Sequence, residues 1–384
     1  MSDTLDLASA LISLPSVTPV DGGCQNLIAA RLAALGFKNE TMQFEDVTNL
    51  WSRLGDSAPL LVFVGHTDVV PTGPVEKWIS APFTPTIRDG FLYGRGSADM
   101  KANIAAFITA LERLIPSKFD AASLSGSIAL MLTSDEEGPG INGVVKVVEE
   151  LQRRQQKIDY CIVGEPSSVT TVGDTVKNGR RGSLNGRIYV NGIQGHAAYP
   201  QRAINPIHTF APALAELCAM KWDEGNQFFP PTSFQVTNVN AGTGADNVIC
   251  GSLEAWINFR FSTESTPEQL KEIVEGVLKK HKVDCSVVWK LSGQPFLTAT
   301  GNLLDVVQEA IVAVTGTATE LSTSGGTSDG RFIAPTGAQV IELGLVNDTI
   351  HKIDECVRVS DLDILSSIYE RIIEGLLAAG IKQS

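Results

Sequence analysis

The sequence predicts an α/β fold with a mixed, largely parallel sheet, into which a smaller α+β domain is inserted. Short apolar runs alternate with amphipathic stretches, and the runs cover residues 60–64, 128–132, 160–163 and 340–343. Such alternation is typical of strands joined by helices, an arrangement that favours a parallel sheet. A chain of 384 residues with 43% hydrophobic content is also long enough to form two domains.

Amphipathic stretches predict helices between and after these runs. A helix is expected to follow Asp99, because apolar residues recur at three- and four-residue spacing from Ile104 to Ile115, and Pro116 is expected to end it. Near the C-terminus, helices are expected over residues 303–314 and at the end of the chain, where apolar residues between 362 and 376 share one face.

The segment from about Gly182 has a different pattern, in which apolar and polar residues alternate. Strands are expected over residues 183–190, 233–239 and 255–261, and helices over 206–220 and from the cap at Thr266 to residue 280. This β-α-β-β-α-β order predicts a ferredoxin-like unit. We therefore expect a main domain formed by residues 1–181 and 295–384, with the inserted domain at 182–294.

The charge and the cysteines exclude several classes of protein. A formal net charge of −13 argues against nucleic acid or a membrane surface as the main partner, because both require clustered Lys and Arg. The first residues are acidic and no apolar run approaches the ~20 residues of a membrane helix, so we expect a cytoplasmic protein. No C-x-x-C pair or cysteine-nucleophile signature occurs, so reduced, mostly buried thiols are expected at Cys24, Cys161, Cys218, Cys250, Cys285 and Cys356.

Histidines and carboxylates follow the ends of the predicted strands. His66 ends the first strand, Glu136 and Glu137 follow the second, Glu165 follows the third and His351 follows the fourth after a short loop. Because the carboxyl ends of parallel strands meet at one edge of a sheet, these side chains are expected to lie together. Each alone has an ordinary alternative, such as a surface histidine or a solvated turn, but two of only five histidines occupy matching strand ends.

Imidazoles and carboxylates without thiolates suit zinc, cobalt or manganese. Asp99, on the turn into its helix, could bridge two ions and leave each with three protein ligands, as in catalytic sites, although it could also simply cap the helix. Asp68 follows His66 by two residues and is expected to hold the imidazole through its other nitrogen. Glu136 and Glu137 are neighbours that point apart in extended chain, so one is expected to ligate and the other to act as a base. The residues alone do not say which.

Five segments resemble the M20 family of dinuclear zinc amidohydrolases, in family order along the whole chain: Gly65-His66-Thr67-Asp68, Gly94-Arg95-Gly96-Ser97-Ala98-Asp99-Met100-Lys101, Asp135-Glu136-Glu137-Gly138, Gly164-Glu165-Pro166 and His351. The resemblance implies a zinc hydrolase with two Zn²⁺ per subunit, one replaceable by Co²⁺, that cleaves a linear amide. It implies that His66 and Glu165 hold one ion, Glu137 and His351 hold the other, Asp99 bridges and Glu136 is the base. One departure is Cys250, where family members commonly have proline.

Candidate substrate contacts lie outside the metal motifs. Arg180, Arg181 and Arg260 are cations that could bind substrate carboxylates bidentately, unless they form ordinary ion pairs. Residues 324–330 offer hydroxyls and backbone N–H groups that could cradle an anionic acyl chain, unless they are only a surface loop. A succinyl group fits these donors better than acetyl. The segments Lys177-Asn178-Gly179-Arg180-Arg181-Gly182-Ser183, Ser324 to Phe332 and Thr349-Ile350-His351-Lys352 are similar to those family members that act on a small dicarboxylate N-succinyl amino acid, and further expected contacts are Gly326, Thr327, Ser328 and Asn347.

His196 lies in the inserted domain, where a loop histidine with a local backbone hydrogen bond would be ordinary. The family resemblance instead implies that it is an oxyanion donor, supplied by a partner subunit in a homodimer, with Tyr199 and Asn247 nearby. The inserted domain would then serve as both lid and dimerisation domain. The alternatives are an acetylornithine deacetylase or another N-acyl-amino-acid hydrolase of the same family, and a non-catalytic metal-binding protein, against which the retained Glu136 argues.

Overall fold

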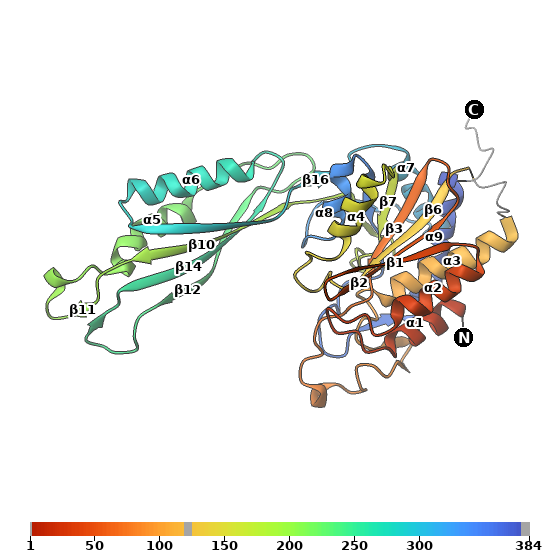
Figure 1. The fold of residues 1–384 in the computed structure, drawn as a ribbon, viewed down its shortest axis with the longest axis horizontal. Helices are drawn as coiled ribbons and strands as arrows, with labels where there is room; N and C mark the ends of the chain where they lie inside the picture. The colour runs from red at the N-terminus through yellow and green to blue at the C-terminus, as the bar shows by residue number, and fades with distance from the viewer. Residues whose placement is uncertain (1, 119–124, 378–384) are drawn as a thin grey trace. The chain divides into compact units, whose positions relative to one another are not determined.

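The computed structural model describes residues 2–118 and 125–377, which form two compact units. Unit 1 comprises Met1–Gly179, Leu297–Ser322 and Ser328–Ser384, and unit 2 comprises Arg180–Phe296 with Thr323–Thr327 (Figure 1). The expected boundaries at 182 and 294 therefore differ slightly, and residues 323–327, expected in the main domain, belong to unit 2. Hydrogen bonds explain this placement, because Arg180 Nη1 donates to the Ser324 carbonyl at 2.8 Å and Thr323 Oγ1 donates to the Phe228 carbonyl at 2.6 Å.

Unit 1 contains an eight-stranded mixed sheet. Its strands, in spatial order, are β1 (Lys38–Phe44), β2 (Val47–Leu54), β6 (Ser127–Thr133), β3 (Leu60–His66), β7 (Tyr160–Val163), β18 (Gln339–Glu342), β8 (Thr175–Lys177) and β17 (Glu320–Ser322). The central run β6-β3-β7-β18 is parallel throughout, whereas β1, β2 and β6 pair antiparallel. The predicted α/β fold with a largely parallel core is confirmed.

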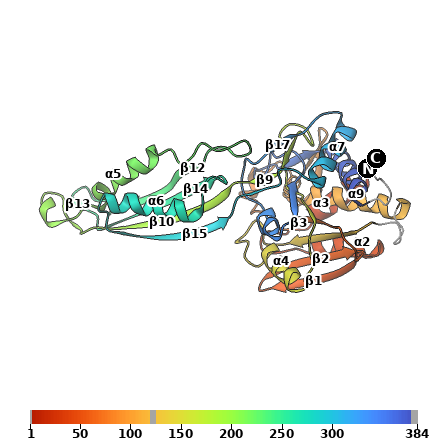
Figure 2. The same ribbon diagram turned by 90° about the horizontal axis from the view of Figure 1, so that it is seen from above.

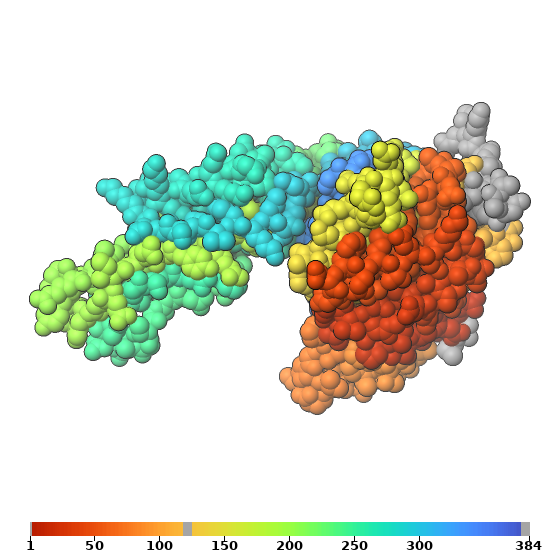
Figure 3. All heavy atoms as spheres, viewed as in Figure 1, coloured from red at the N-terminus to blue at the C-terminus, as the bar shows by residue number. Residues whose placement is uncertain are grey.

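Helices cover both faces of this sheet. One face carries α1 (Asp3–Ile12), α2 (Cys24–Ala34), α3 (Lys101–Lys118), α7 (Asn302–Thr315) and α9 (Val359–Leu377), which share a hydrophobic core with the alternate β3 residues Leu61 and Phe63. Figure 2 shows α3 and α9 side by side within this layer. The other face carries α4 (Val144–Arg153) and α8 (Gly330–Ile333). In Figure 3, α4, coloured yellow, lies beside the red N-terminal strands.

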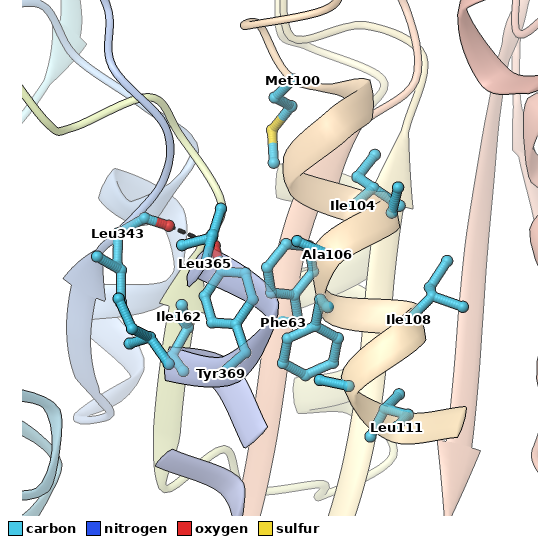
Figure 4. Packing of buried hydrophobic residues seen from close by; sticks show 14 of the residues in the cluster. Phe63, Met100, Ile104, Ala106, Ile108, Leu111, Ile162, Leu343, Leu365 and Tyr369 are labelled. Atoms are coloured by element: carbon cyan, nitrogen blue, oxygen red, sulfur yellow. Dashed lines mark hydrogen bonds between the residues drawn. The ribbon is translucent and has the colours of Figure 1, made fainter. Parts of the chain in front are cut away.

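An aromatic cluster fills the core behind the functional edge of the sheet (Figure 4). The rings of Phe63 and Phe107 stack with centroids 4.2 Å apart, and Tyr369 meets both rings edge-on. The Tyr369 hydroxyl donates to the Leu343 carbonyl at 2.5 Å, so its polar end is satisfied in an apolar environment. The prediction that Pro116 ends its helix is wrong, because α3 continues to Lys118. Pro116 is therefore an interior residue of α3, and it removes only the one backbone hydrogen bond that its own nitrogen cannot donate.

A small three-stranded sheet links two distant loops of unit 1. It consists of β4 (Thr86–Arg88), β5 (Phe91–Tyr93) and β19 (Cys356–Arg358), in the order β19-β5-β4. The register pairs Cys356 with Tyr93. Since Asp99 follows β5 and His351 precedes β19, this pairing places the loops that carry these two residues side by side.

The described part of the chain also contains three short 3₁₀ turns: η1 (Val75–Lys77), η2 (Pro200–Arg202) and η3 (Ala334–Thr336).

Unit 2 is built around a four-stranded antiparallel sheet with two helices on one face. Its elements are β10 (Gly182–Asn191), α5 (Pro206–Ala219), β12 (Ser233–Ala241), β14 (Ser252–Phe261), α6 (Pro267–Lys280) and β15 (Cys285–Gly293), with sheet order β12-β14-β10-β15. The predicted capping box at Thr266 starts α6. A two-stranded ladder of β11 (Gly195–His196) and β13 (Val248–Ile249) lies beyond the end of β10. The chain leaves and re-enters unit 1 through β9 (Gly179–Arg180) and β16 (Phe296–Leu297).

Several strands were given no range in the sequence analysis, among them the β1–β2 hairpin and β15, the last strand that the β-α-β-β-α-β order requires. The hairpin of β1 and β2 begins with a polar edge strand, KNETMQF, in which Met42 alone is fully buried. β15 lies at the edge of its sheet and is only partly buried along its length. Edge strands often carry polar and charged side chains, which discourage pairing with other chains and weaken the apolar pattern. Within residues 2–118 and 125–377, no helix combines the length and apolar character needed to cross a membrane.

Candidate metal centre

The parallel core of unit 1 delivers functional side chains to one edge of the sheet. β3 ends at His66, β6 leads into the turn that carries Glu136 and Glu137, and β7 is followed by Glu165. The fourth strand, β18, leads through a loop to His351. Because these strands are adjacent and run in the same direction, their carboxyl ends meet, and the structure brings the five residues together as the sequence predicted.

Asp99 lies between the two histidines and presents one oxygen to each. His66 Nε2 is 3.0 Å from Asp99 Oδ1, and His351 Nε2 is 3.3 Å from Asp99 Oδ2. Glu165 Oε1 lies 3.7 Å from His66 Nε2, and Glu137 Oε1 lies 3.0 Å from His351 Nε2. The ligand atoms thus form two groups, one histidine and one glutamate each, that share a single carboxylate.

Glu136 also lies at this centre. Its carboxylate falls within 4.8 Å of ligand atoms of both His66 and Glu165, and a second group within the same distance contains His66, Asp99 and Glu137. Proximity therefore does not by itself separate a ligand from a base. Both glutamates of the turn face the centre, which differs from the expectation that neighbours would point apart, because the chain is not extended here.

Asp68 supports the centre in a way that corrects the sequence prediction. His66 Nδ1 lies 2.8 Å from the backbone carbonyl of Asp68, whereas the Asp68 carboxylate is 3.6 Å from the same nitrogen. The carboxylate instead accepts the backbone N–H groups of Glu136 at 3.4 Å and Glu137 at 3.2 Å. Asp68 therefore holds the turn that carries both glutamates, while its main chain orients His66.

Burial and mutual repulsion shift the pKa values of these groups. Burial, reinforced by the charge of Asp99, raises the pKa of Glu165 well above its usual value. Burial also raises the pKa of Glu136, although the charge of His66 opposes the shift. Burial disfavours charge on Asp99 as well, but hydrogen bonds from His351 and His66 hold its pKa below the usual range. Three of the carboxyl groups at the centre are thus strongly perturbed, as is common at functional sites.

The histidines are perturbed in the opposite direction from ordinary buried histidines. Hydrogen bonds to Asp99 and Glu137 raise the pKa of His351 to about 10. Burial lowers the pKa of His66, but the hydrogen bond to Asp99 and the charge of Glu165 outweigh it and raise the pKa well above normal. Protons on these imidazoles compensate carboxylate charge that divalent cations would otherwise neutralise, so the donor set fits two such ions.

Two further buried carboxyl groups at the centre were not assigned roles from the sequence. Asp329 follows the loop at 324–328, and burial raises its pKa to about 6 against the opposing charges of Arg331 and His66. Glu355 accepts the backbone N–H of Asp99 at 3.1 Å. Asp329 could have been suspected because it lies within the segment Ser324 to Phe332, whereas Glu355 had no signal beyond following His351 by four residues.

The expected substrate contacts fall into separate places. In unit 2, the register of β10 and β14 pairs Ser183 with Arg260, which sets Arg260 beside the start of β10, close to Arg180 and Arg181. Burial, together with the neighbouring cations, lowers the pKa of Arg181 and of Arg260. Three guanidinium groups thus gather at one end of the unit 2 sheet, an arrangement that favours anions.

Other expected contacts differ in exposure. Gly326 is exposed and Thr327 half-buried in the segment of unit 2 that follows Ser324. Ser328, expected as a substrate contact, lies in unit 1, where its side chain is buried and its hydroxyl donates to Glu342. Asn347, also in unit 1, is half-buried and donates its backbone N–H to the Ser168 carbonyl at 3.0 Å.

His196 lies at the opposite end of unit 2 from the arginines. The backbone N–H of Ala198 donates to His196 Nδ1 at 3.0 Å, which leaves Nε2 to carry the proton of the neutral ring. The exposed imidazole meets the Tyr199 ring edge-on at 5.7 Å, and the Asn247 carbonyl accepts the Ala197 N–H at 2.8 Å. The intervening strand β10 has ten residues and so spans roughly 30 Å.

These features define a candidate metal centre of the kind found in metal-dependent hydrolases, at the carboxyl edge of an α/β sheet. The chain belongs to the peptidase family M20/M25/M40, whose model matches residues 62–375. It is 60% identical over 377 residues to a succinyl-diaminopimelate desuccinylase of Nitrosococcus oceani, with 98% of this chain and 100% of that protein covered. It is 61% identical to the enzyme of the same name from Thioalkalivibrio sulfidiphilus, again with 98% and 100% covered.

Solved structures show the same fold at low sequence identity. An M20 family metallo-carboxypeptidase from Sulfolobus solfataricus superposes with a TM-score of 0.82 at 16% identity, covering 98% of this chain and 99% of that chain. A dinuclear metal-binding peptidase of the M20 family from Bacillus subtilis gives a TM-score of 0.72 at 16% identity, covering 97% of both chains.

Proposed function

We propose that this chain hydrolyses N-succinyl-L,L-2,6-diaminopimelate to L,L-2,6-diaminopimelate and succinate, a step in the synthesis of lysine and of cell-wall precursors. Support comes from relatives of about 60% identity that carry the name of this activity over their full length. The structural observation that carries the proposal is Asp99, which presents one carboxylate oxygen to His66 and the other to His351. A shared carboxylate between two histidine–glutamate groups is suited to a pair of metal ions.

The proposed ligand set divides between two ions, taken to be zinc, with cobalt able to replace one of them. His66 and Glu165 would hold one ion, Glu137 and His351 would hold the other, and Asp99 would contact both. When bound, such ions supply Lewis acidity, which lowers the pKa of water and polarises an amide carbonyl. The imidazole and carboxylate donors, with no thiolate among them, are typical of catalytic rather than structural zinc.

Glu136 is the residue proposed to move the proton. Its carboxylate would take a proton from the attacking water and pass it to the leaving amine nitrogen, so that the amide C–N bond breaks and a carboxylate and an amine form. Burial raises its pKa, which brings the carboxyl closer to the neutral range where a group can both accept and donate a proton. Asp68 would keep this glutamate in place through its hydrogen bond to the Glu136 N–H.

The arginines of unit 2 are proposed to bind substrate carboxylates. The substrate is a dicarboxylate on its amino-acid part and carries a further carboxylate on the succinyl group. Arg181 and Arg260 have pKa values lowered by burial and by neighbouring cations, so an anion bound there would relieve repulsion. Gly326, Thr327 and Asn347 remain candidate hydrogen-bonding partners for the substrate.

His196 is proposed to stabilise the developing oxyanion, from a second subunit of a homodimer. Its Nε2 carries a proton that it could donate, because Nδ1 already accepts from Ala198. The strand β10 separates it from Arg181 and Arg260 by roughly 30 Å, far more than the length of a substrate of this size. If both groups serve one substrate molecule, His196 must therefore come from another copy, with Tyr199 and Asn247 beside it.

The test is amide hydrolysis by the metal-reconstituted protein, measured in parallel on N-succinyl-L,L-diaminopimelate and N-acetylornithine, with a chelator control. We expect turnover of the succinyl substrate that is lost with chelator and restored by zinc. Preference for the acetyl substrate would retain the metal mechanism but overturn the assignment of the arginines to the succinyl group. Turnover that survives complete metal removal would overturn the proposed mechanism.

A further inference from the structure

Glu355 is a buried carboxylate at the back of the metal centre, and the proposed reaction gives it no role. Its side chain is 1% exposed and forms an ion pair of 2.8 Å with Arg95, which is 2% exposed. The second oxygen, Oε1, accepts the backbone N–H groups of Ala98 at 2.8 Å and Asp99 at 3.1 Å. Oε2 also accepts the Gly96 N–H at 3.1 Å. Four donors from the turn leading to Asp99 therefore converge on this one side chain.

The small sheet explains why Glu355 reaches this turn across more than 250 residues of sequence. β5 and β19 pair antiparallel, and the N–H of Gly94, just after β5, donates to the Glu355 carbonyl at 3.0 Å. The main chain of Glu355 is thus fixed beside the start of the turn that leads to Asp99, and the Glu355 side chain extends along this turn. The contact is part of the fold and not a chance approach of two surface loops.

Arg95 connects Glu355 to a second loop, the one that carries His351. Its Nη1 donates both to Glu355 and, at 3.1 Å, to the backbone carbonyl of Lys352. Lys352 directly follows His351, which has a φ of 60°, a conformation that non-glycine residues adopt only when the surroundings support it. The Arg95–Glu355 pair therefore holds the turn of Asp99 and the loop of His351 at the same time.

We propose that Glu355, acting with Arg95, is a positioning residue that orients Asp99 and His351 and so controls binding at the half of the metal centre formed by Asp99, Glu137 and His351. This inference rests on the proposed dinuclear site. The pair supports both Asp99 and the loop of His351, whereas the half formed by His66 and Glu165 is connected to it through Asp99, whose Oδ1 lies 3.0 Å from His66 Nε2. Loss of the pair should therefore weaken one half of the centre more than the other.

A purely structural ion pair would behave differently. Removing one partner of a buried ion pair destabilises a protein whatever else the pair does, so a lower melting temperature alone does not distinguish the two roles. A positioning role requires that the folded variant, well below its melting temperature, binds the ion of the Asp99, Glu137 and His351 group more weakly than the wild type does. The cobalt spectrum offers a second readout, because its visible absorption depends on the geometry of the ligands.

The experiment is calorimetric titration of Co²⁺ into metal-stripped protein, for wild type, Glu355→Gln, Arg95→Lys and the control Asp159→Asn. Asp159 serves as the control because it also accepts a backbone N–H, from Leu60 at 2.9 Å, and pairs with a cation, Lys157, at 2.6 Å, although this pair is more exposed than that of Glu355. Asp159 directly precedes β7, and its partner Leu60 is the first residue of β3, about 20 Å along that strand from His66.

We expect wild type and the control to bind two ions per chain, and the affinity for each ion should be the same in the two proteins. Glu355→Gln should bind the ion of the Asp99, Glu137 and His351 group about 10- to 100-fold more weakly, with an altered cobalt spectrum. The ion of the His66 and Glu165 group should be weakened less, because that group shares only Asp99 with the Arg95–Glu355 pair. Arg95→Lys, which keeps every backbone hydrogen bond to Glu355, should show a smaller loss in the same direction and decides the matter if Glu355→Gln does not fold. Wild-type affinity for both ions in the folded variants, or an equal loss for both ions, would overturn this inference. A single ion bound by the wild type would instead overturn the proposed dinuclear site.

Discussion

His66 is oriented by the backbone carbonyl of Asp68, which lies 2.8 Å from Nδ1, and not by the Asp68 carboxylate, which lies 3.6 Å away. A carbonyl oxygen can only accept a hydrogen bond, so Nδ1 carries a proton and Nε2 faces the centre. The orientation of the ring is therefore independent of the Asp68 side chain. The carboxylate is left to hold the turn that carries the two glutamates.

Asp68→Ala should consequently reduce turnover while both metal ions are retained. The variant keeps the carbonyl that orients His66 but removes the acceptor of the Glu136 and Glu137 N–H groups. We expect kcat to fall roughly 10- to 100-fold, the usual effect of removing a partner of a ligand-bearing segment. The measurements are kcat on the succinyl substrate and bound zinc by atomic absorption, with Asp159→Asn as the control. Loss of the metal held by His66 would show that the carboxylate acts on the imidazole after all.

Glu136→Gln should separate the roles of the adjacent glutamates. Glutamine has nearly the same shape but cannot take a proton, so we expect a rate loss of roughly 10²-fold or more with metal content near wild type. Both quantities can be measured on the same preparation. Near-normal turnover would rule out the proposed base. Loss of one metal ion would identify Glu136 as a ligand, which its position within 4.8 Å of the His66 and Glu165 ligand atoms allows geometrically.

Metal binding should strengthen with rising pH well beyond the range of an ordinary histidine. Hydrogen bonds to Asp99 and Glu137 raise the pKa of His351 to about 10, so its ring holds a proton at neutral pH that must leave before Nε2 can bind an ion. Titrations in buffers of different ionisation enthalpy should show proton release on metal binding at pH of about 8, where an unperturbed histidine would release almost none. Affinity that levels off just above pH of about 6.5 would contradict the shift.

The same shift predicts how the metal-free protein responds to pH. His351 has a folded-state pKa above its unfolded value, so its stabilising contribution is complete below pH of about 6.5 and is lost as the pH rises through about 10. The melting temperature of chelator-treated protein should therefore fall across this range. Metal-loaded protein should lack this decline, because the ion replaces the proton. His351→Gln, melted without metal, is the control and should show a flatter profile.

Mixing two inactive variants tests whether His196 acts across subunits. Glu136→Gln affects a residue of unit 1, and His196→Ala affects a residue of unit 2. In a mixed dimer, the intact metal centre of one chain would meet the intact His196 of the other. Random exchange should then restore activity to about a quarter of the wild-type sites. No recovery after verified subunit exchange, or full activity of a monomer, would contradict the cross-subunit role.

Gly164 should tolerate no side chain. A Cβ atom there would lie 2.3 Å from Phe63 Cζ and 2.5 Å from Met100 Cε, within the closely packed core behind Glu165. Gly164→Ala should lower the free energy of unfolding by about 1–3 kcal/mol through overpacking. The matched control is Gly276→Ala in α6, where nothing lies within 4 Å of the new Cβ and helix propensity favours alanine by about 0.5–1 kcal/mol. Denaturant unfolding measures both, and equal effects would show that the predicted clash is relieved by repacking.

Local sequence predicted the parallel core and the set of residues at its edge. Buried strands such as β3 are nearly continuous apolar runs, and β3, β6 and β7 each end within a few residues of a predicted site residue, so strand and residue are visible in one short segment. The edge strand β1 was missed, and β15 was implied by the element order but given no range, because partly exposed strands carry a weaker apolar pattern. Pro116 was wrongly predicted to end its helix, because a proline removes one backbone hydrogen bond but does not always stop the helix.

The sequence by itself determined which residue types stand at the ends of the strands, since that information is local. Only the tertiary structure decided how they are supported. Three examples depend on contacts between separate segments of the chain. Asp68 accepts hydrogen bonds from the turn of the glutamates, Ser328 donates to Glu342, and Glu355 accepts hydrogen bonds from the turn that leads to Asp99. Such contacts arise from strand pairing such as that of β5 with β19, whose partners and register no single segment of a chain encodes.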